Sequence, residues 1–415
     1  MTDTPTTTDA DPGQHDHGTA WRRAIRRAGL VYLFSRLCTV LGAAIVAAEI
    51  RHDEDTRLQD FPWARWGDPH YAGREVPISM VRLVRDVFTS WDGAWYMRIA
   101  RSGYPHHIAA NVTYDMPDAR AAFFPVFPGI VRVLDHVLPG GPAVAALALN
   151  FLLGALAVLL VGVLARDIFG VATGERAMVL MALFPGSFVL SFAYTEAVLI
   201  VLAALTLLLL QRSQWVAAGV VAAVATATRP NGIAVCVACA VAAGLAIHRR
   251  REWRALVAPI LSPLGFLGFQ WWLGHHTGER GVWFRVQTEA WGEGTSFGFT
   301  AVRRTAQAII NPVSSPTNSI TAVCVAALVF MFWLARTHRI PAPMVAYSAM
   351  ITVLMVIPET VTARPRFVYT AFPLLICVAA WFELRKREWW HWTIVTCAVG
   401  LTTLTALYGV NGAIP

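Results

Sequence analysis

Residues 142–165, PAVAALALNFLLGALAVLLVGVLA, form an apolar run whose only strongly polar side chain is Asn150. An α-helix rises about 1.5 Å per residue, so about 20 apolar residues cross a hydrocarbon core of about 30 Å. This run is long enough for that. Comparable runs recur to the C-terminus, and the sequence therefore predicts an all-α protein that crosses a membrane several times.

The composition supports the same prediction. Of the 415 residues, 56% are hydrophobic and only 14% are charged, and the mean hydropathy is +0.51. Soluble globular proteins have about 45–50% apolar and about 25% charged residues. The values exclude an ordinary soluble enzyme, and the repetition of apolar runs excludes a single-span anchor. All six cysteines lie inside these runs, which predicts small buried side chains rather than metal ligands.

Eleven apolar runs predict a bundle of about 11 transmembrane helices. Some are shorter than a normal span, which indicates tilted or broken helices. The predicted spans are 28–49, 142–165, 177–192, 196–211, 214–228, 231–247, 255–273, 319–335, 341–357, 367–383 and 391–410.

Arginine clusters orient these spans. If the N-terminus is cytoplasmic, five basic clusters fall on the cytoplasmic side, as the positive-inside rule requires, and the C-terminus lies outside. The clusters are Arg166 with Arg176, Arg212, 248–251, 336–339 and 385–387. The net charge of +8 is explained by this bias, so nucleic acid is not an expected partner.

The domain organisation follows from the same pattern. Residues 1–20 are polar and predict a disordered cytoplasmic tail. Residues 21–411 predict one transmembrane domain, with a long first extracytoplasmic loop at 50–120 and a second at 274–318. Residues 123–138 are apolar but contain two charges, and we expect a helix that dips into the outer side without crossing.

Five ionisable residues fall at the outer ends of the predicted spans. Charges at membrane depth are costly and indicate a functional site. The residues are Asp92, Glu196, Arg229, Arg364 and Arg366. We expect them to converge on the extracytoplasmic face.

The segment 90–100, SWDGAWYMRIA, predicts a short amphipathic helix with Trp91, Trp95 and Ile99 on one face. Such aromatic density is typical of a helix in the headgroup layer. From residue type alone, Asp92 is equally consistent with a catalytic carboxylate and with a carboxylate that stabilises the helix start.

The ordered set of motifs resembles the PIG-V-type mannosyltransferases. The matching segments are 91–104 (WDGAWYMRIARSGY), 122–128 (AFFPVFP), 183–185 (LFP), 194–197 (YTEA), 228–232 (TRPNG) and, as in bacterial members, 364–367 (RPRF). Eukaryotic members often have His-Phe where this chain has Trp95-Tyr96, so their acceptor is not carried over.

The resemblance implies a GT-C-type glycosyltransferase that takes mannose from a polyprenyl-phosphate-mannose donor outside the cytoplasm and forms an α-linked mannoside with inversion. It assigns the family's catalytic aspartate to Asp92. Arginines hold a departing phosphate well because they bind it in a bidentate manner, and we expect Arg366, Arg364 and Arg229 in that role.

Five further residues are predicted to contact substrate, each with a second interpretation. Trp91, Trp95 and Tyr96 would stack on a sugar or anchor the chain at the interface, and Asn231 would bind substrate or satisfy carbonyls freed by a helix break. Glu196 would bind hydroxyls or pair with Arg229. In the loop 274–318, the residues Trp283, Arg285, Trp291 and Glu293 would cap the site or bind the acceptor.

The sequence leaves three alternatives open. No protein metal site is predicted, but a divalent cation, Mg or Mn, could share the neutralisation of phosphate. The acceptor could be a glycolipid, a glycan or a protein. The alternative functions are transfer of a different polyprenyl-phosphate sugar and, from another class, secondary transport, although no internal repeat supports a transporter.

Overall fold

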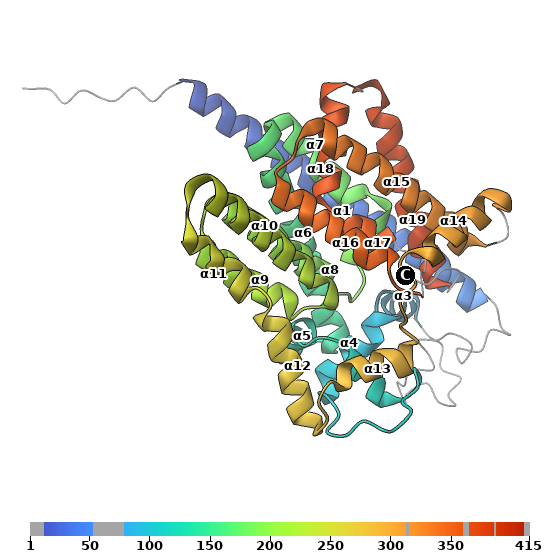
Figure 1. Cartoon of the computed structure of the whole chain (residues 1–415). Helices are drawn as coiled ribbons and strands as arrows, with labels where there is room; N and C mark the ends of the chain where they lie inside the picture. Colours follow the sequence, from blue (N-terminus) through green and yellow to red (C-terminus); the bar gives the residue numbers. More distant parts are fainter. Residues whose placement is uncertain (1–11, 53–78, 313–314, 360–364, 386, 411–415) are drawn as a thin grey trace, which may run out of the picture.

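The computed structural model describes residues 12–52, 79–312, 315–359, 365–385 and 387–410. Apart from one isolated bridge between Thr295 and Pro358, the regular structure in these ranges is helical. The all-α prediction is confirmed (Figure 1).

Long helices alternate with short ones along the chain, and the 3-10 helices among them are marked η. Up to residue 226 the chain forms α1 (Pro12–His52), α3 (Met80–Phe88), α4 (Asp92–Ser102), η2 (Pro117–Ala122), α5 (Val126–Asp135), α6 (Gly141–Phe169), α7 (Val171–Leu183), η3 (Pro185–Leu190), α8 (Glu196–Gln211) and α9 (Trp215–Thr226). From residue 230 onward it forms η4 (Pro230–Gly232), α10 (Ile233–Arg250), η5 (Trp253–Leu256), α11 (Val257–Leu261), α12 (Leu264–Thr277), α13 (Val282–Trp291), α14 (Phe299–Ile310), α15 (Pro316–His338), α16 (Ala342–Val356), α17 (Pro365–Thr370), α18 (Pro373–Leu384), η6 (Arg387–Trp389) and α19 (Trp390–Gly409).

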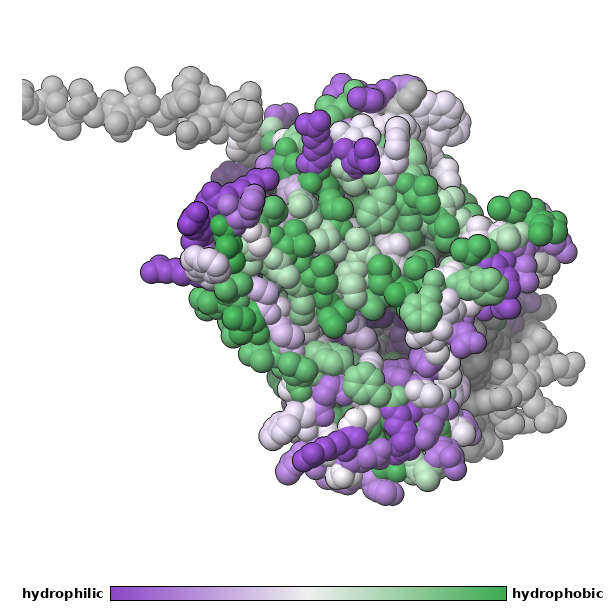
Figure 2. Space-filling model, in the orientation of Figure 1, coloured by the Kyte–Doolittle hydropathy of each residue, from purple (hydrophilic) through white to green (hydrophobic). Residues whose placement is uncertain are grey.

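The protein is a multi-pass membrane protein. Among the described residues, 6 helical stretches are long and apolar enough to cross a bilayer, and α8, α9, α16 and α18 are shorter apolar helices. Each predicted span falls on one of these elements, except that 177–192 falls on α7 with η3 and 367–383 falls on α17 with α18. The count of eleven stays a prediction. Figure 2 shows the apolar belt, with hydrophilic side chains gathered below it and at its upper left edge.

One sequence-based boundary differs from the structure. The helix α1 begins at Pro12, inside the stretch 1–20 that was expected to be disordered, because helix formation continues past the polar residues before the apolar run. Residues 1–11, and 53–78 of the first loop, lie outside the described residues. The apolar stretch 123–138 forms the short helix α5, which packs against α6.

The amphipathic helix predicted at 90–100 is α4, but protein rather than lipid covers its apolar face. Trp95 is 2% exposed and Ile99 is 5% exposed. Trp95 packs against Phe123 and Trp291, with ring centroids 5.8 and 6.1 Å away. The expectation of interfacial anchoring is therefore wrong for Trp95, because the second external loop supplies the covering surface.

Proline interrupts two apolar stretches, and the polar residues that follow or adjoin the two breaks lie at the same depth in the helix bundle. Pro185 follows α7 and starts η3, so the next helix, α8, begins only at Glu196. Pro230 separates α9 from α10 and leaves Arg229 in the turn. At the first break, a Cβ on Gly186 would lie 2.6 Å from the Pro365 carbonyl oxygen. Only glycine lets η3 approach α17 this closely.

A buried arginine ties α1 to the first break. The Arg36 guanidinium donates to the Ser187 carbonyl at 3.0 Å, the Ser191 hydroxyl at 2.8 Å and the Ala182 carbonyl at 3.2 Å. It forms no ion pair with any residue in the described ranges. Polar groups buried in a bundle cost free energy unless they are hydrogen-bonded, so Arg36 and the carbonyls of this broken segment satisfy one another.

We predict that replacing Arg36 with leucine lowers the unfolding temperature of the detergent-purified protein. The Ser187 carbonyl would lose its guanidinium donor, and an unpaired buried acceptor costs about 1–3 kcal/mol. Lysine should give an intermediate loss, because an ammonium group cannot reproduce the planar set of donors. Thermal unfolding followed by intrinsic fluorescence measures the effect.

The matched control is Arg22→Leu, at an exposed position of the same helix, which should leave the unfolding temperature nearly unchanged. An Arg36→Leu variant as stable as the control would contradict the proposed structural role of Arg36.

Candidate active site

Asp92 is the first residue of α4 and is positioned by a constrained backbone. Trp91, which precedes it, has a φ of 56°, a left-handed value that is unfavourable for a bulky residue. Its indole nitrogen donates to the Tyr408 carbonyl at 3.0 Å, and the Ala193 amide donates to the Phe88 carbonyl at 2.8 Å. These contacts from distant parts of the chain hold the segment in place.

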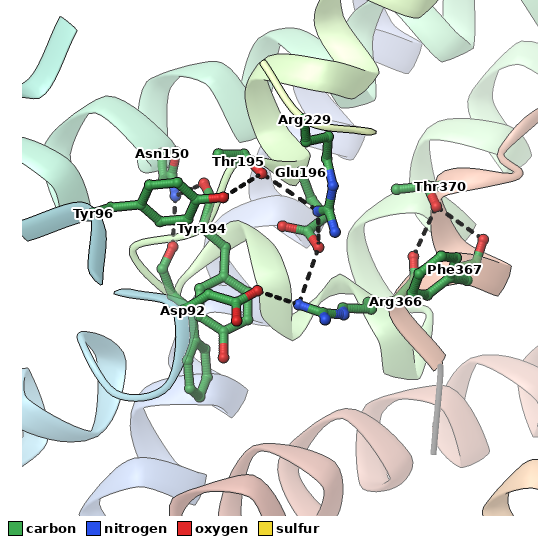
Figure 3. Close-up of polar contacts among 11 residues, drawn as sticks. Asp92, Tyr96, Asn150, Tyr194, Thr195, Glu196, Arg229, Arg366, Phe367 and Thr370 are labelled. Atoms are coloured by element: carbon green, nitrogen blue, oxygen red, sulfur yellow. Dashed lines mark hydrogen bonds and ion pairs between the residues drawn. The ribbon is translucent and has the colours of Figure 1, made fainter. Parts of the chain in front are cut away.

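Two carboxylates and two guanidiniums form a continuous chain of ion pairs (Figure 3). Arg366 donates to the Asp92 carboxylate at 2.5 Å and lies 3.7 Å from Glu196, which pairs in turn with Arg229. The side chains of Asp92, Arg366, Arg229 and Glu196 are 24%, 14%, 10% and 1% exposed. Exposure therefore falls from Asp92 toward Glu196, and the charged groups neutralise one another.

Neutral polar residues hold this chain of ion pairs from the side of α6 and α8. The Asn150 amide donates to the carbonyls of Phe192 and Tyr194 at 2.5 and 2.7 Å, which fixes the turn before Glu196. The Thr195 hydroxyl accepts from Arg229 at 3.4 Å and lies 3.4 Å from the Tyr96 hydroxyl. The site thus rests on α4, the 191–195 turn and α17 together.

Two phenols near Asp92 stay protonated. Burial, with a contribution from the negative charge of Asp92, raises the pKa of Tyr114 to about 12. The same two causes raise the pKa of Tyr96 above its ordinary value. Neither phenol can therefore accept a proton readily near neutral pH, and the carboxylates of Asp92 and Glu293 are the acidic groups that line the cavities at this site.

Asp92 lies where two cavities meet. The larger has a volume of about 680 Å³, and its walls include Arg366, Asn231, Trp91 and the apolar residue Leu354. The smaller has a volume of about 140 Å³ and includes Arg229 and Tyr96. Both share five residues, Asp92, Pro230, Gln287, Trp291 and Glu293. The ion-pair chain is therefore accessible from two sides.

The second external loop covers the site. In α13, Trp283 donates from its indole nitrogen to the Ala122 carbonyl at 2.9 Å, and Trp283, Trp291 and Glu293 line the larger cavity. Arg285 points elsewhere and pairs with Glu279 at 2.6 Å and Glu289 at 2.8 Å. The loop therefore contributes walls to the cavities.

The structure brings together most of the residues singled out in the sequence. Asp92, Glu196, Arg229 and Arg366 are in contact, as expected from their predicted level. The remaining candidates are spread around them: Trp91 and Asn231 line the larger cavity, Tyr96 lines the smaller, Trp95 lines neither, and Arg364 lies outside the described residues.

Sequence reasoning did not single out Asn150 or Gln287 as site residues. Asn150 was visible as the one amide within the apolar run 142–165, and an amide at membrane depth usually has a partner to satisfy. Gln287 carried no such signal, because a glutamine in a polar loop is unremarkable until the loop folds back over the cavity.

The described residues contain no group of three or more His, Cys, Asp or Glu side chains that could hold a metal ion. The carboxylates of Asp92 and Glu196 both face guanidiniums.

Comparison with known protein families gives a match over part of the chain. Residues 125–272 match the family model described as dolichyl-phosphate-mannose-protein mannosyltransferase. No curated protein matches the chain.

Solved structures resemble the chain at low identity. ArnT from Cupriavidus metallidurans in the apo state has 18% identity and a TM-score of 0.49, with 71% of this chain and 55% of that chain covered. The same protein bound to undecaprenyl phosphate has 15% identity and a TM-score of 0.48, with 76% and 71% covered. The oligosaccharyltransferase of Archaeoglobus fulgidus in the apo form has 15% identity and a TM-score of 0.43, with 91% and 54% covered. The chain thus spans about half the length of two of these three structures.

We predict that Glu196 and Arg229 are energetically coupled. Glu196→Gln leaves the buried Arg229 guanidinium without its anion, and breaking a buried pair costs about 3–5 kcal/mol. Adding Arg229→Gln should recover part of this loss, because no uncompensated charge then remains. Unfolding of the two single variants and the double variant completes the cycle.

The exposed pair Arg27–Glu175, at 3.4 Å with side chains 69% and 28% exposed, is the matched control. Its cycle should give a coupling of about 0–1 kcal/mol. Equal coupling in the two cycles would show that burial does not strengthen the Glu196–Arg229 interaction.

Proposed function

We propose that this protein is a GT-C-type membrane glycosyltransferase that transfers mannose from a polyprenyl-phosphate-mannose donor to an extracytoplasmic acceptor. The observation that carries the proposal is the contact between Asp92 and Arg366 at the junction of two cavities. Such a site offers a proton acceptor beside a phosphate-binding cation. The motif resemblance and the family model over 125–272 support the same reaction.

The acceptor hydroxyl is a weak nucleophile, and Asp92 is the base that activates it. The hydroxyl oxygen attacks the anomeric carbon of the sugar while its proton passes to the Asp92 carboxylate. The bond between that carbon and the phosphate oxygen breaks, and polyprenyl phosphate leaves with the electron pair. One displacement inverts the anomeric centre, so a β-linked donor yields an α-linked mannoside.

Arg366 stabilises the leaving phosphate. Guanidinium–phosphate hydrogen bonds are charge-assisted and bidentate, and a phosphate ester leaves without protonation by a second carboxylic acid. When the phosphate of the lipid substrate binds Arg366, the guanidinium divides its N–H groups between this phosphate and Asp92. The Asp92 carboxylate is then held less tightly and is available to the acceptor hydroxyl. Arg229 supports the same charge from the smaller cavity, and Arg364 remains a proposed partner on sequence grounds.

The larger cavity suits the lipid donor. Its wall contains Leu354, Ile357 and Phe367 beside Arg366, so apolar and cationic surfaces adjoin as the two parts of a polyprenyl phosphate require. We assign Trp91 and Asn231 to this donor side.

The smaller cavity suits the acceptor hydroxyl. Tyr96 and Arg229 line it and Glu196 lies behind them, so Tyr96 is placed to donate to the acceptor while Glu196 holds Arg229. Trp95 supports this wall through Trp291 and has no direct substrate contact in the proposal. The acceptor class, whether glycolipid, glycan or protein, is set by groups beyond these residues.

Position in the membrane follows from the charge pattern. We propose a multi-pass protein of the cell membrane with a cytoplasmic N-terminus and an extracytoplasmic active site. A divalent cation, Mg or Mn, would supply further neutralisation of the phosphate if one binds together with the donor.

The first test is sugar transfer by membranes containing the full chain. Radiolabelled polyprenyl-phosphate mannose should yield labelled product, and polyprenyl-phosphate glucose or arabinose should not. Labelled product from one of those sugars alone would establish the alternative donor. Uptake of a free solute without any glycosylated product would contradict the transferase and favour transport.

We predict that Asp92→Asn reduces transfer by about 10²–10⁴-fold, the usual contribution of a positioned general base. The amide cannot accept the proton but keeps the size of the side chain. The control is Asp115→Asn, in the same external region, where the carboxylate accepts from Thr113 and lines neither cavity. Full transfer by a folded Asp92→Asn variant would eliminate the assignment of the base.

We predict that Arg366→Gln lowers kcat/KM for the donor by about tenfold to hundredfold, because a hydrogen bond to a charged group contributes about 1.5–3 kcal/mol. Arg366→Lys should retain more activity than the glutamine variant, since it keeps the charge. Equal activity of the lysine and glutamine variants would argue against a phosphate role.

A further inference from the structure

A second amphipathic cavity lies at the opposite end of the bundle. It has a volume of about 360 Å³ and is formed by the turn between α8 and α9, the last turns of α10 and the start of α16. Leu210, Ala246 and Met344 lie on its floor and are 5%, 4% and 1% exposed. Arg249 and Arg250 lie on its rim. An apolar floor below a cationic rim is complementary to an anionic amphiphile.

One cation on the rim, the Arg249 guanidinium, is not neutralised by any described residue. Arg250 pairs with Glu252 at 3.0 Å and donates to the Ser213 hydroxyl at 3.2 Å. Glu252 also accepts from the Trp215 indole at 2.6 Å, so its carboxylate is occupied on both oxygens. Arg249 is exposed and forms no ion pair or hydrogen bond with a residue in the described ranges. The cavity therefore has a net positive rim.

The helices that form this cavity also reach the candidate active site. The helix α8 starts at Glu196 in the ion-pair chain and ends at Gln211 on the rim. The helix α16 starts at the rim and ends just before Ile357, which lines the larger site cavity. Helices of this length span about 24 Å, close to the thickness of the hydrocarbon core, which is about 30 Å.

The cavity below Arg249 and the larger cavity at Asp92 thus lie at opposite faces of the bilayer. With the active site at one membrane boundary, the cavity below Arg249 falls at the headgroup level of the other leaflet. Figure 1 places the end of α10 far from α4 and α13, and Figure 2 shows hydrophilic side chains at that edge. This is the face that the arginine clusters assign to the cytoplasm.

We propose that this cavity is a binding site for an anionic phospholipid of the cytoplasmic leaflet. The phosphate is held by Arg249 and Arg250, Ser213 and Gln211 supply neutral hydrogen-bonding groups, and the glycerol end of the acyl chains covers the apolar floor. Anionic lipids are concentrated at this depth and are attracted by clustered arginines between transmembrane helices. The site is separate from the proposed glycosyl transfer.

The experiment is native mass spectrometry of the full chain purified in a neutral detergent and incubated with 1-palmitoyl-2-oleoyl phosphatidylglycerol or the matching phosphatidylcholine. We expect phosphatidylglycerol to be retained and phosphatidylcholine not. Each arginine near an anionic headgroup contributes about fivefold to affinity. Arg249→Gln should therefore weaken retention about fivefold, and Arg249→Gln with Arg250→Gln about thirtyfold.

The matched control is Arg254→Gln, a nearby exposed arginine that does not line the cavity, which should retain phosphatidylglycerol like the parent chain. Equal retention of the two lipids would overturn the proposal, as would a loss in Arg254→Gln as large as in Arg249→Gln. Inorganic phosphate is the competing probe. If phosphate raises the unfolding temperature in an Arg249-dependent manner while phosphatidylglycerol is not retained, the site binds a soluble anion and the lipid proposal is wrong.

Discussion

Mutual neutralisation of two carboxylates and two guanidiniums inside an apolar bundle is the interaction on which this structure depends. Isolated charges at this depth would be prohibitively costly, so Asp92, Arg366, Glu196 and Arg229 must meet for the helices that carry them to pack. Their helices are interrupted near Pro185 and Pro230. The interruptions allow polar side chains to turn toward one another where continuous helices would present them to lipid.

The same network links stability and chemistry. Arg366 contacts Asp92 and Glu196, so a ligand that engages its guanidinium changes the environment of the carboxylate beside it. Arg36 supports the opposite side of the broken segment through carbonyls and hydroxyls without a carboxylate partner among the described residues. The two arginines differ accordingly. Arg36 donates its hydrogen bonds within the broken segment, whereas Arg366 lines the larger cavity.

The sequence predicted the features that hydropathy and charge determine. The apolar runs match helices, and the ionisable residues near the outer span ends do converge, because each is too costly to leave unpaired in a membrane. Helical periodicity predicted α4 and its apolar face. It did not indicate whether protein or lipid covers that face, because both pack against apolar side chains. Trp95 was therefore misjudged. The loop 274–318 was expected to cap the site or bind the acceptor, but which of its residues line the cavities depends on a long-range fold of the chain that local patterns do not encode. The tail boundary was missed because polar residues next to a long helix can extend it.

The contact between Trp91 and Tyr408 has a consequence for biosynthesis. The indole beside the proposed catalytic carboxylate and the carbonyl that receives its hydrogen bond are 317 residues apart in the sequence. A Cβ on Gly42 would lie 2.6 Å from the Thr402 carbonyl oxygen, so α1 and α19 also meet directly. Synthesis must therefore pass Tyr408 before the geometry around Asp92 can be completed, and a chain terminated before α19 would be inserted in the bilayer without an assembled reaction centre.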